Sequence, residues 1–202
     1  YGDGRQVFSG LHLTISKGST TALIGPSGAG KSTLVDILTG FRRPQRGHVT
    51  SNGQNLSDYS VESLRQHIGY LTQEPEIFDA TVLENIRMGW PEATGEDCIA
   101  AAQKAHAHDF IADLPKQYDT PVGDRGNTLS VGQRQRLALA RVIVRKPDLY
   151  IFDEPTSALD QESERLVRNS MKALEREATV IIIAHQLSTI DHADAIYRIG
   201  AQ

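Results

Sequence analysis

Residues 25–32 of this chain read Gly25-Pro26-Ser27-Gly28-Ala29-Gly30-Lys31-Ser32, with two glycines separated by four residues and then Lys and Ser. The apolar run Thr20–Ile24 predicts a buried strand before this segment, and apolar residues at helical spacing follow from Ser32 to Thr39. Glycines let backbone N–H groups curl around an anion, and a helix N-terminus adds partial positive charge. In this strand–loop–helix context the motif predicts a nucleoside-triphosphate site. The residues that we expect to bind the nucleotide here are Gly25, Pro26, Ser27, Gly28, Ala29, Gly30, Lys31, Ser32 and Thr33.

Two acidic residues complete this predicted site. Lys31 can reach the outer phosphates, and the Ser32 hydroxyl can ligate the Mg²⁺ that accompanies them. Asp153 ends a second apolar run, Leu149–Phe152, where a carboxylate can hold a magnesium-bound water at the carboxyl edge of a sheet. Glu154 comes next and is placed to orient or deprotonate an attacking water.

The remaining pattern predicts an α/β fold. Val180–Ile183 is a further β-rich apolar run, and the charged segment Gln161–Arg176 before it carries an apolar stripe that is typical of a surface helix. Strands alternating with helices predict a parallel sheet covered by helices. Gly47–Asn55, with Asn52-Gly53 as its turn, predicts a small antiparallel hairpin.

The middle of the chain, from Thr81 to Lys146, is rich in helix-forming residues and predicts a helical insertion in the α/β core. Asp97–Ala112 is alanine-rich, and Ser130–Arg145 is long and amphipathic, with Ser130 and Gln133 in a capping-box pattern. We expect the basic residues at this second helix to lie on its solvent-exposed face. They are Arg134, Arg136, Arg141, Arg145 and Lys146.

Composition excludes several classes. A length of 202 residues fits one globular domain, and 21 Lys and Arg against 25 Asp and Glu argue against general nucleic-acid binding. The longest apolar run is far too short to span a bilayer, and the single Cys98 excludes an internal disulfide. Because the chain begins at Tyr1 without a Met, we expect it to be a piece of a longer protein.

A second anion site is indicated about a hundred residues after the first. Leu129-Ser130-Val131-Gly132-Gln133 opens the long amphipathic helix with small residues. Since the first phosphate site is already furnished, this one is best assigned to the γ-phosphate bound by a second copy or a partner. Together, these motifs resemble those of the nucleotide-binding domain of ATP-binding-cassette (ABC) proteins. The resemblance covers essentially the whole chain, with six motifs in the family's order.

The resemblance implies a P-loop NTPase (RecA-like) core at about 1–74 and 147–202, with a small antiparallel β subdomain and a helical subdomain inserted at about 75–146. It implies ATP and Mg²⁺ as cofactors and ATP hydrolysis as the activity. Glu154 resembles the catalytic base, and His185 the switch histidine that contacts the γ-phosphate. Tyr1 looks like the residue that stacks on adenine, and the signature residues Ser130, Gly132 and Gln133 look like the second phosphate contact. The metal residues implied are Ser32, Gln73 and Asp153.

Partners are implied in the same way. Gln73 resembles the glutamine that senses a membrane domain, and Ser157–Asp160 the loop that communicates across a dimer. Such domains pair head to tail, as homodimers or heterodimers, and no nucleic acid is expected. Three stretches, at 73–86, 110–120 and 122–126, resemble exporter domains fused to membrane segments. We therefore expect a transmembrane domain in the same full-length chain, at the cytoplasmic face of a bacterial inner membrane.

One position departs from the family. Its first signature glycine is Val131 here, so the contact across the dimer depends on where this side chain points. Two other classes stay open. One is a soluble ABC ATPase acting on nucleic acid or the ribosome, which the lack of a basic tail or long coiled-coil insertion opposes. The other is a weakly hydrolysing, regulatory half of a heterodimeric transporter, which Val131 favours and which Glu154 and His185 oppose.

Overall fold

The computed structural model describes residues 7–184, 190 and 192–200. Within these residues a sheet of five strands runs in the order β4-β5-β6-β1-β7, and all its pairings are parallel. The strands are β1 (Thr20–Ile24), β4 (Ile68–Leu71), β5 (Leu149–Asp153), β6 (Thr179–Ala184) and β7 (Ala195–Arg198). The parallel sheet expected from alternating strands and helices is therefore confirmed.

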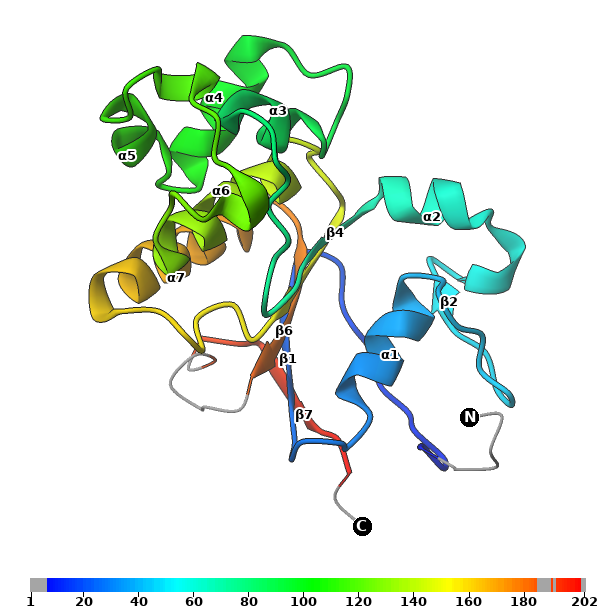
Figure 1. Ribbon diagram of the computed structural model, residues 1–202. Helices are drawn as coiled ribbons and strands as arrows, with labels where there is room; N and C mark the ends of the chain where they lie inside the picture. The colour runs from blue at the N-terminus through cyan, green and yellow to red at the C-terminus, as the bar shows by residue number, and fades with distance from the viewer. Residues whose placement is uncertain (1–6, 185–189, 191, 201–202) are drawn as a thin grey trace.

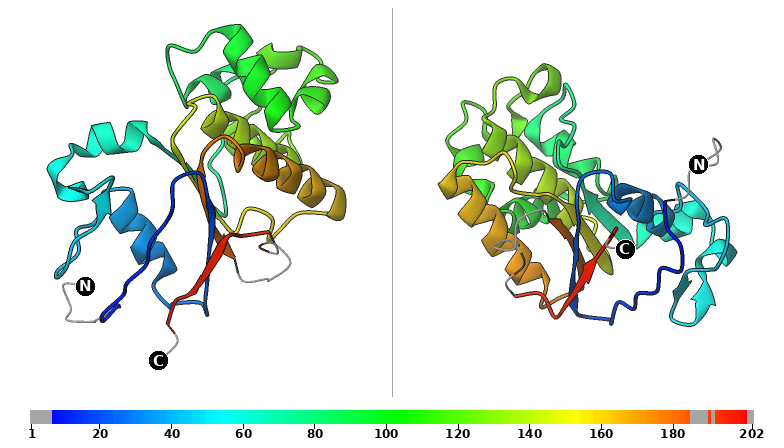
Figure 2. Two further views of the ribbon diagram at one scale, coloured as in Figure 1. Left: turned by 180° about the vertical axis from the view of Figure 1, so that it is seen from behind. Right: turned by 90° about the horizontal axis from the view of Figure 1, so that it is seen from below.

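Helices cover both faces of this sheet, as Figures 1 and 2 show. On one face α1 (Lys31–Leu38) packs through Leu34 and Val35 against strand residues such as Ile151. On the other face lie α6 (Val131–Ile143) and α7 (Gln161–Leu174), which bury residues such as Leu137 and Met171 against the sheet. Burial on both faces explains why β1, β5 and β6 are nearly continuous apolar runs.

A helical part lies beyond one end of the sheet (Figure 1, green). It contains α3 (Val82–Arg87), α4 (Gly95–Lys104) and α5 (His108–Ala112), which accompany α6. The alanine-rich stretch Asp97–Ala112 is not one helix, because the chain turns at His106, whose φ is 50°. Ala105 and Ala107 on either side of this turn are fully buried, so tertiary packing overrides helix propensity here. In the described part of the chain, no helix is long and apolar enough to cross a membrane.

A small group of elements lies beside α1, away from the helical part (Figures 1 and 2). The predicted hairpin is formed by β2 (Thr50–Ser51) and β3 (Gln54–Asn55), which pair antiparallel. Its turn residues Asn52 and Gly53 both have positive φ, at 51° and 81°, as a two-residue hairpin turn requires. Beside this hairpin lie α2 (Val61–Gln66) and the 3-10 helix η1 (Leu56–Asp58). The 3-10 helices η2 (Gln117–Asp119) and η3 (Asp124–Gly126) belong instead to the helical part, where η2 contacts α3 and α5.

Candidate nucleotide-binding site

The predicted phosphate loop lies between the end of β1 and the start of α1. Helices α3, α4, α6 and α7 each begin with a side chain that accepts a hydrogen bond from the first turn. Helix α1 instead begins after Gly30, which has φ 98° and offers no side-chain cap. The first N–H groups of a helix have no backbone partner inside the helix, and a helix that begins on glycine presents its N-terminus to an acceptor such as a phosphate.

Glycine is required at position 30 by its surroundings as well as by its backbone angle. A Cβ atom there would lie 2.4 Å from Val7 Cγ1 and 2.7 Å from the Phe8 ring. At Gly28, where φ is 77°, the space around the missing Cβ is open. The loop is therefore packed tightly at its base and open at its tip, which is where an anion would approach.

Lys31 turns back over this loop. Its Nζ donates hydrogen bonds to Gly25 O at 2.7 Å and to Pro26 O at 3.0 Å, and the residue is only 7% exposed. Two neutral carbonyl oxygens do not neutralise a buried ammonium group, so the loop holds a positive charge next to the N-terminus of α1. These donors fit the triphosphate of a nucleotide.

The carboxyl edge of the sheet brings the two predicted acids to the same side of the molecule as the loop. Parallel pairing of β5 with β6, and of β6 with β1, places the ends of all three strands at one edge. Asp153 closes β5, and Glu154 follows it. Within the described ranges no group of three His, Cys, Asp or Glu side chains could hold a metal ion alone. A metal bound here would therefore depend on Ser32 and Gln73 beside Asp153, on phosphate oxygens and on water, which is the usual environment of Mg²⁺.

Asp153 has a partner that the sequence did not indicate. Tyr70, on the neighbouring strand β4, donates its hydroxyl hydrogen to Asp153 Oδ2 at 3.0 Å. Burial raises the pKa of the Tyr70 hydroxyl, and the charge of Asp153 raises it further. The hydroxyl consequently stays protonated at neutral pH and acts as the donor.

Glu154 sits in an uncommon backbone conformation. Its φ is 47°, and its N–H donates to Ile183 O of β6 at 2.9 Å. A non-glycine residue with positive φ costs free energy, and such residues concentrate at functional sites. Gln73 Nε2 donates hydrogen bonds to Glu154 Oε2 and to Ser157 Oγ, both at 3.3 Å. The structure thus brings together Gln73, Glu154 and the first residue of the 157–160 loop.

The signature residues form the start of α6. Ser130 Oγ accepts from the Gln133 N–H at 3.2 Å, and the Ser130 N–H donates to Gln133 Oε1 at 2.9 Å, so the predicted capping box is present. Gly132 is buried against α7, because a Cβ there would lie 2.1 Å from Ser163 Oγ. Val131, at the position of the missing glycine, is 47% exposed and points outward.

The five basic residues predicted on this helix do not form one solvated face. Helix α6 ends at Ile143, before Arg145 and Lys146, and two of the other three basic residues are largely buried. Arg136 is only 8% exposed. Arg141 donates to Asn85 O at 2.8 Å, to Asn85 Oδ1 at 2.7 Å and to Glu76 O at 2.7 Å. Burial lowers the pKa of Arg141 to about 10. Arg141 therefore joins α6 to α3 and to the segment after Gln73.

Tyr1 and His185 lie outside the described residues. The 157–160 loop ends at Asp160, which caps α7 by accepting from the Ser163 N–H at 3.0 Å and the Glu162 N–H at 3.1 Å. The hydrogen bonds from Ser163 lower the pKa of Asp160. Ser130 and the phosphate loop belong to different elements, and among the described residues no hydrogen bond joins them.

A parallel sheet with a glycine loop between β1 and α1, and with acids at the end of a nearby strand, defines a P-loop nucleotide-binding fold. Residues 8–157 match the family described as ABC transporter. The chain belongs to the ABC transporter family, of which it is an ATPase domain. The family predicted from the motifs is thus confirmed.

Similar proteins agree with this assignment. Two proteins of Staphylococcus aureus, from strains NCTC 8325 and bovine RF122, are provisionally named multidrug export ATP-binding/permease proteins. They are 46% and 45% identical to this chain over 190 residues, covering 94% of it and 33% of each relative. The solved structure of a bacterial Atm1-family ABC exporter with ATP bound matches with a TM-score of 0.91 and 41% identity, over 96% of this chain and 34% of that one. The chain therefore spans about a third of the length of these relatives. Neither of the two alternative classes is favoured by these comparisons.

Proposed function

We propose that this chain binds and hydrolyses ATP and that the resulting conformational change powers export of a substrate across a membrane. One observation carries the proposal: a positively charged phosphate loop and two adjacent carboxylates share the carboxyl edge of one parallel sheet. A triphosphate fits the loop, and a hydrolytic water fits beside the acids.

In this proposal the phosphates are bound by the Lys31 ammonium group and by the backbone N–H groups of residues 25–33, except Pro26, which has none. Ser32, Gln73 and Asp153 hold Mg²⁺, and Tyr1 stacks on the adenine. Mg²⁺, when bound, neutralises the charge that develops on the phosphate oxygens. The Lys31 side chain supports this assignment, because its Nζ already lies inside the loop.

Glu154 orients the attacking water and accepts its proton, and His185 contacts the γ-phosphate. The hydrogen bond from Gln73 supports this role of Glu154, because it fixes one carboxylate oxygen at the end of β5. The strained backbone conformation at Glu154 also holds its side chain at the end of β5.

Two copies, or this chain and a similar one, would form a head-to-tail dimer. In it, Ser130, Gly132 and Gln133 of one copy contact the γ-phosphate held by the loop of the other. The start of α6 supports this arrangement, since it is a helix N-terminus whose first residue, Val131, is exposed at the surface.

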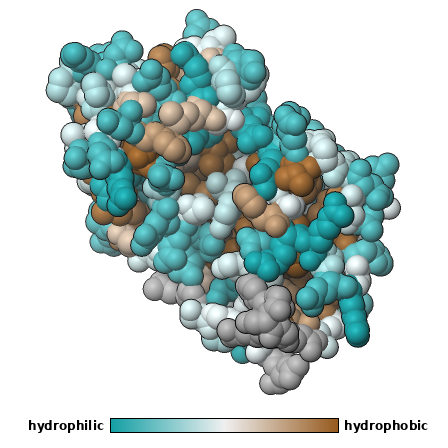
Figure 3. All heavy atoms as spheres, turned by 45° about the vertical axis from the view of Figure 1, so that its right-hand side comes forward, coloured by the Kyte–Doolittle hydropathy of each residue, from teal (hydrophilic) through white to brown (hydrophobic). Residues whose placement is uncertain are grey.

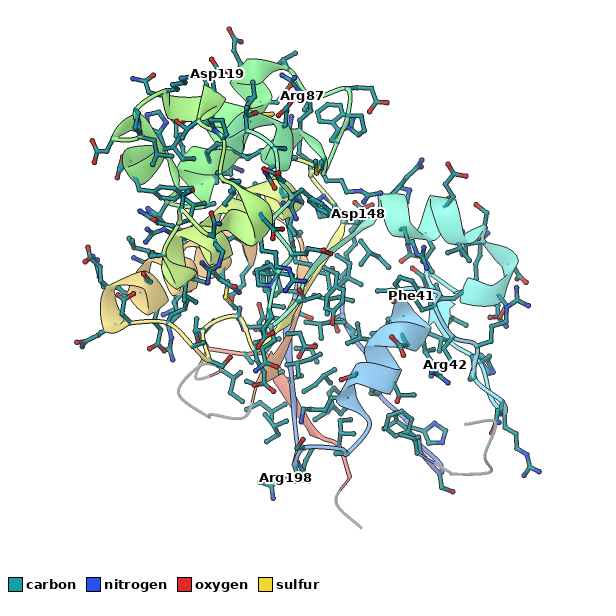
Figure 4. All side chains as sticks on the ribbon, viewed as in Figure 1. Phe41, Arg42, Arg87, Asp119, Asp148 and Arg198 are labelled. Carbon is teal, nitrogen blue, oxygen red and sulfur yellow. The ribbon has the colours of Figure 1, made fainter. Side chains whose placement is uncertain are left out.

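A transmembrane domain in the same full-length protein would use the motion of this dimer, with the present domain at the cytoplasmic face of a bacterial membrane. The relatives support this, because their names combine ATP-binding and permease functions and this chain covers a third of them. Apolar residues also reach the surface on the side turned forward in Figure 3. Phe41, at the end of α1 in Figure 4, is 68% exposed, with the Arg65 guanidinium 3.8 Å from its ring centroid. Contiguous apolar residues on a surface are typical of a site that contacts another domain.

The test compares the natural chain with Glu154→Gln and with Glu162→Gln, which alters an exposed carboxylate on α7. We expect Glu154→Gln to lower the ATP hydrolysis rate by about 10²- to 10⁴-fold, because the general base is lost. The same variant should form a stable dimer with ATP in size-exclusion chromatography, whereas Glu162→Gln should behave like the natural chain. Hydrolysis at the natural rate in Glu154→Gln would contradict the proposed role of Glu154.

A further inference from the structure

We propose that Tyr70 is a positioning residue that holds the Asp153 carboxylate in the orientation needed for Mg²⁺. This inference rests on the proposed function, in which Asp153 belongs to the metal site. Its basis is the hydrogen bond of 3.0 Å from the Tyr70 hydroxyl to Asp153 Oδ2, which joins the ends of two neighbouring strands.

The sheet itself places these two side chains together. β4 pairs with β5 so that Tyr70 lies opposite Ile151, two residues before Asp153. Side chains alternate between the faces of a strand, so Ile151 and Asp153 share a face, and Tyr70 lies beside them on the same face. This is the face that α1 covers, because Tyr70 and Ile151 both belong to the cluster that α1 residues complete. Tyr70 is therefore on the side of the sheet from which the phosphate loop leads into α1.

The ring of Tyr70 is held firmly enough to position another group. It packs against the buried cluster that contains Ile68, Ile151 and Leu34. A carboxylate at the end of a strand is otherwise free to rotate, and a fixed hydroxyl donor removes much of that freedom. With Oδ2 engaged by Tyr70, Oδ1 remains for the metal or its water. Groups of this kind, which hold metal ligands in place, typically change metal affinity by 10- to 100-fold when they are removed.

Tyr70 also connects the metal acid to Gln73. Only two residues lie between them along the chain. The end of β4 therefore holds Asp153 through Tyr70 and Glu154 through Gln73. A displacement of this strand end would move both carboxylates together, so the metal side and the water side of the site are coupled through one segment.

The experiment measures Mn²⁺ binding by electron paramagnetic resonance in the presence of a non-hydrolysable ATP analogue. The variants are Tyr70→Phe, Asp153→Asn, their combination, and Tyr118→Phe as a matched control. Tyr70→Phe removes only the hydroxyl and keeps the ring, so the packing of the cluster is retained. Tyr118 is also half-buried, and its hydroxyl is also hydrogen-bonded to a side chain, at 2.8 Å from His108 Nδ1. Tyr118, however, lies in the helical part.

We expect Tyr70→Phe to weaken Mn²⁺ binding by about tenfold and Asp153→Asn to weaken it at least as much, with Tyr118→Phe unchanged. In the double variant the loss from Tyr70→Phe should largely disappear, because no carboxylate is left to position. Affinity for the analogue without metal should be the same in all four. If Asp153→Asn weakens Mn²⁺ binding while Tyr70→Phe changes it by less than about twofold, the positioning role is overturned and the metal site stands. If neither substitution matters, the assigned metal site is wrong and the positioning role falls with it.

Discussion

Val61 and Val131 occupy the same position in two different helices. Each is the first residue of its helix, α2 or α6, and each directly follows a serine whose Oγ accepts from a backbone N–H three residues on, at 3.1 Å in α2 and 3.2 Å in α6. Their side chains are 42% and 47% exposed. The local environment of the two valines is therefore closely matched, but only Val131 lies in the surface that we propose to meet a second copy.

Glycine substitutions at these two positions can be compared to measure the effect of Val131, which replaces the first signature glycine of the family. Val131→Gly should strengthen ATP-dependent dimerisation by roughly 1 kcal/mol, about fivefold in Kd, because a glycine lets the partner's phosphate approach the α6 N-terminus. Sedimentation of the Glu154→Gln chain with ATP, with and without the substitution, measures this. Val61→Gly introduces the same flexibility after a serine cap and should leave the dimer unchanged. Equal effects of both glycines would show that Val131 does not oppose the contact.

Arg141 should be a major contributor to stability. Arg141→Ala leaves the carbonyl oxygens of Asn85 and Glu76 and the buried Asn85 side chain without this donor, so we expect the free energy of unfolding to fall by about 3 kcal/mol. Arg141→Lys keeps the charge but not the forked geometry and should recover only part of this. Urea denaturation measures both. Arg165→Ala, on the exposed side of α7, should stay within about 0.5 kcal/mol of the natural chain. If Arg141→Ala lowered the free energy of unfolding no more than Arg165→Ala does, these hydrogen bonds would add nothing to stability.

The Asp97 carboxylate should contribute to acid sensitivity. Hydrogen bonds from the Thr94 side chain, and then from Lys146, lower its pKa below the ordinary value of 3.8. A carboxylate with a lowered folded-state pKa adds stability above its unfolded pKa, and this stability is lost as the pH falls through the folded value. Asp97→Asn can accept the same capping hydrogen bonds at every pH, so its thermal midpoint should fall less between neutral pH and about pH 3.

The neighbouring exposed carboxylate provides the control for this pH dependence. Glu96→Gln, one residue earlier on α4, should keep the full acid dependence of the natural chain. The melting curves of the two variants and the natural chain are compared at the same ionic strength, because exposed charge pairs such as Lys146–Asp97 are screened by salt. Parallel pH curves for Asp97→Asn and the natural chain would exclude a role for the cap in acid sensitivity.

Local features of this fold could be predicted from short stretches of sequence. The glycines before Lys31, the Asn52-Gly53 turn and the Ser130–Gln133 capping box each depend on residues within a few positions of one another, and the structure has all three. The alanine-rich stretch Asp97–Ala112 shows the limit of this reasoning. Its composition favours a helix throughout, but burial of Ala105 and Ala107 against the rest of the helical part decides where the chain turns.

The sequence alone determined that a phosphate loop, two acids and a signature helix are present, because each is a short motif whose chemistry depends on neighbouring residues. How these parts meet depends on long-range packing. Tyr70 and Asp153 are 83 positions apart, Gln73 and Glu154 are 81 apart, and Arg141 reaches Asn85 across 56. The pairing of parallel strands joins the first two pairs, and the packing of α6 on α3 joins the third. No local pattern encodes such contacts, since they depend on which strands and helices become neighbours when the apolar faces are buried.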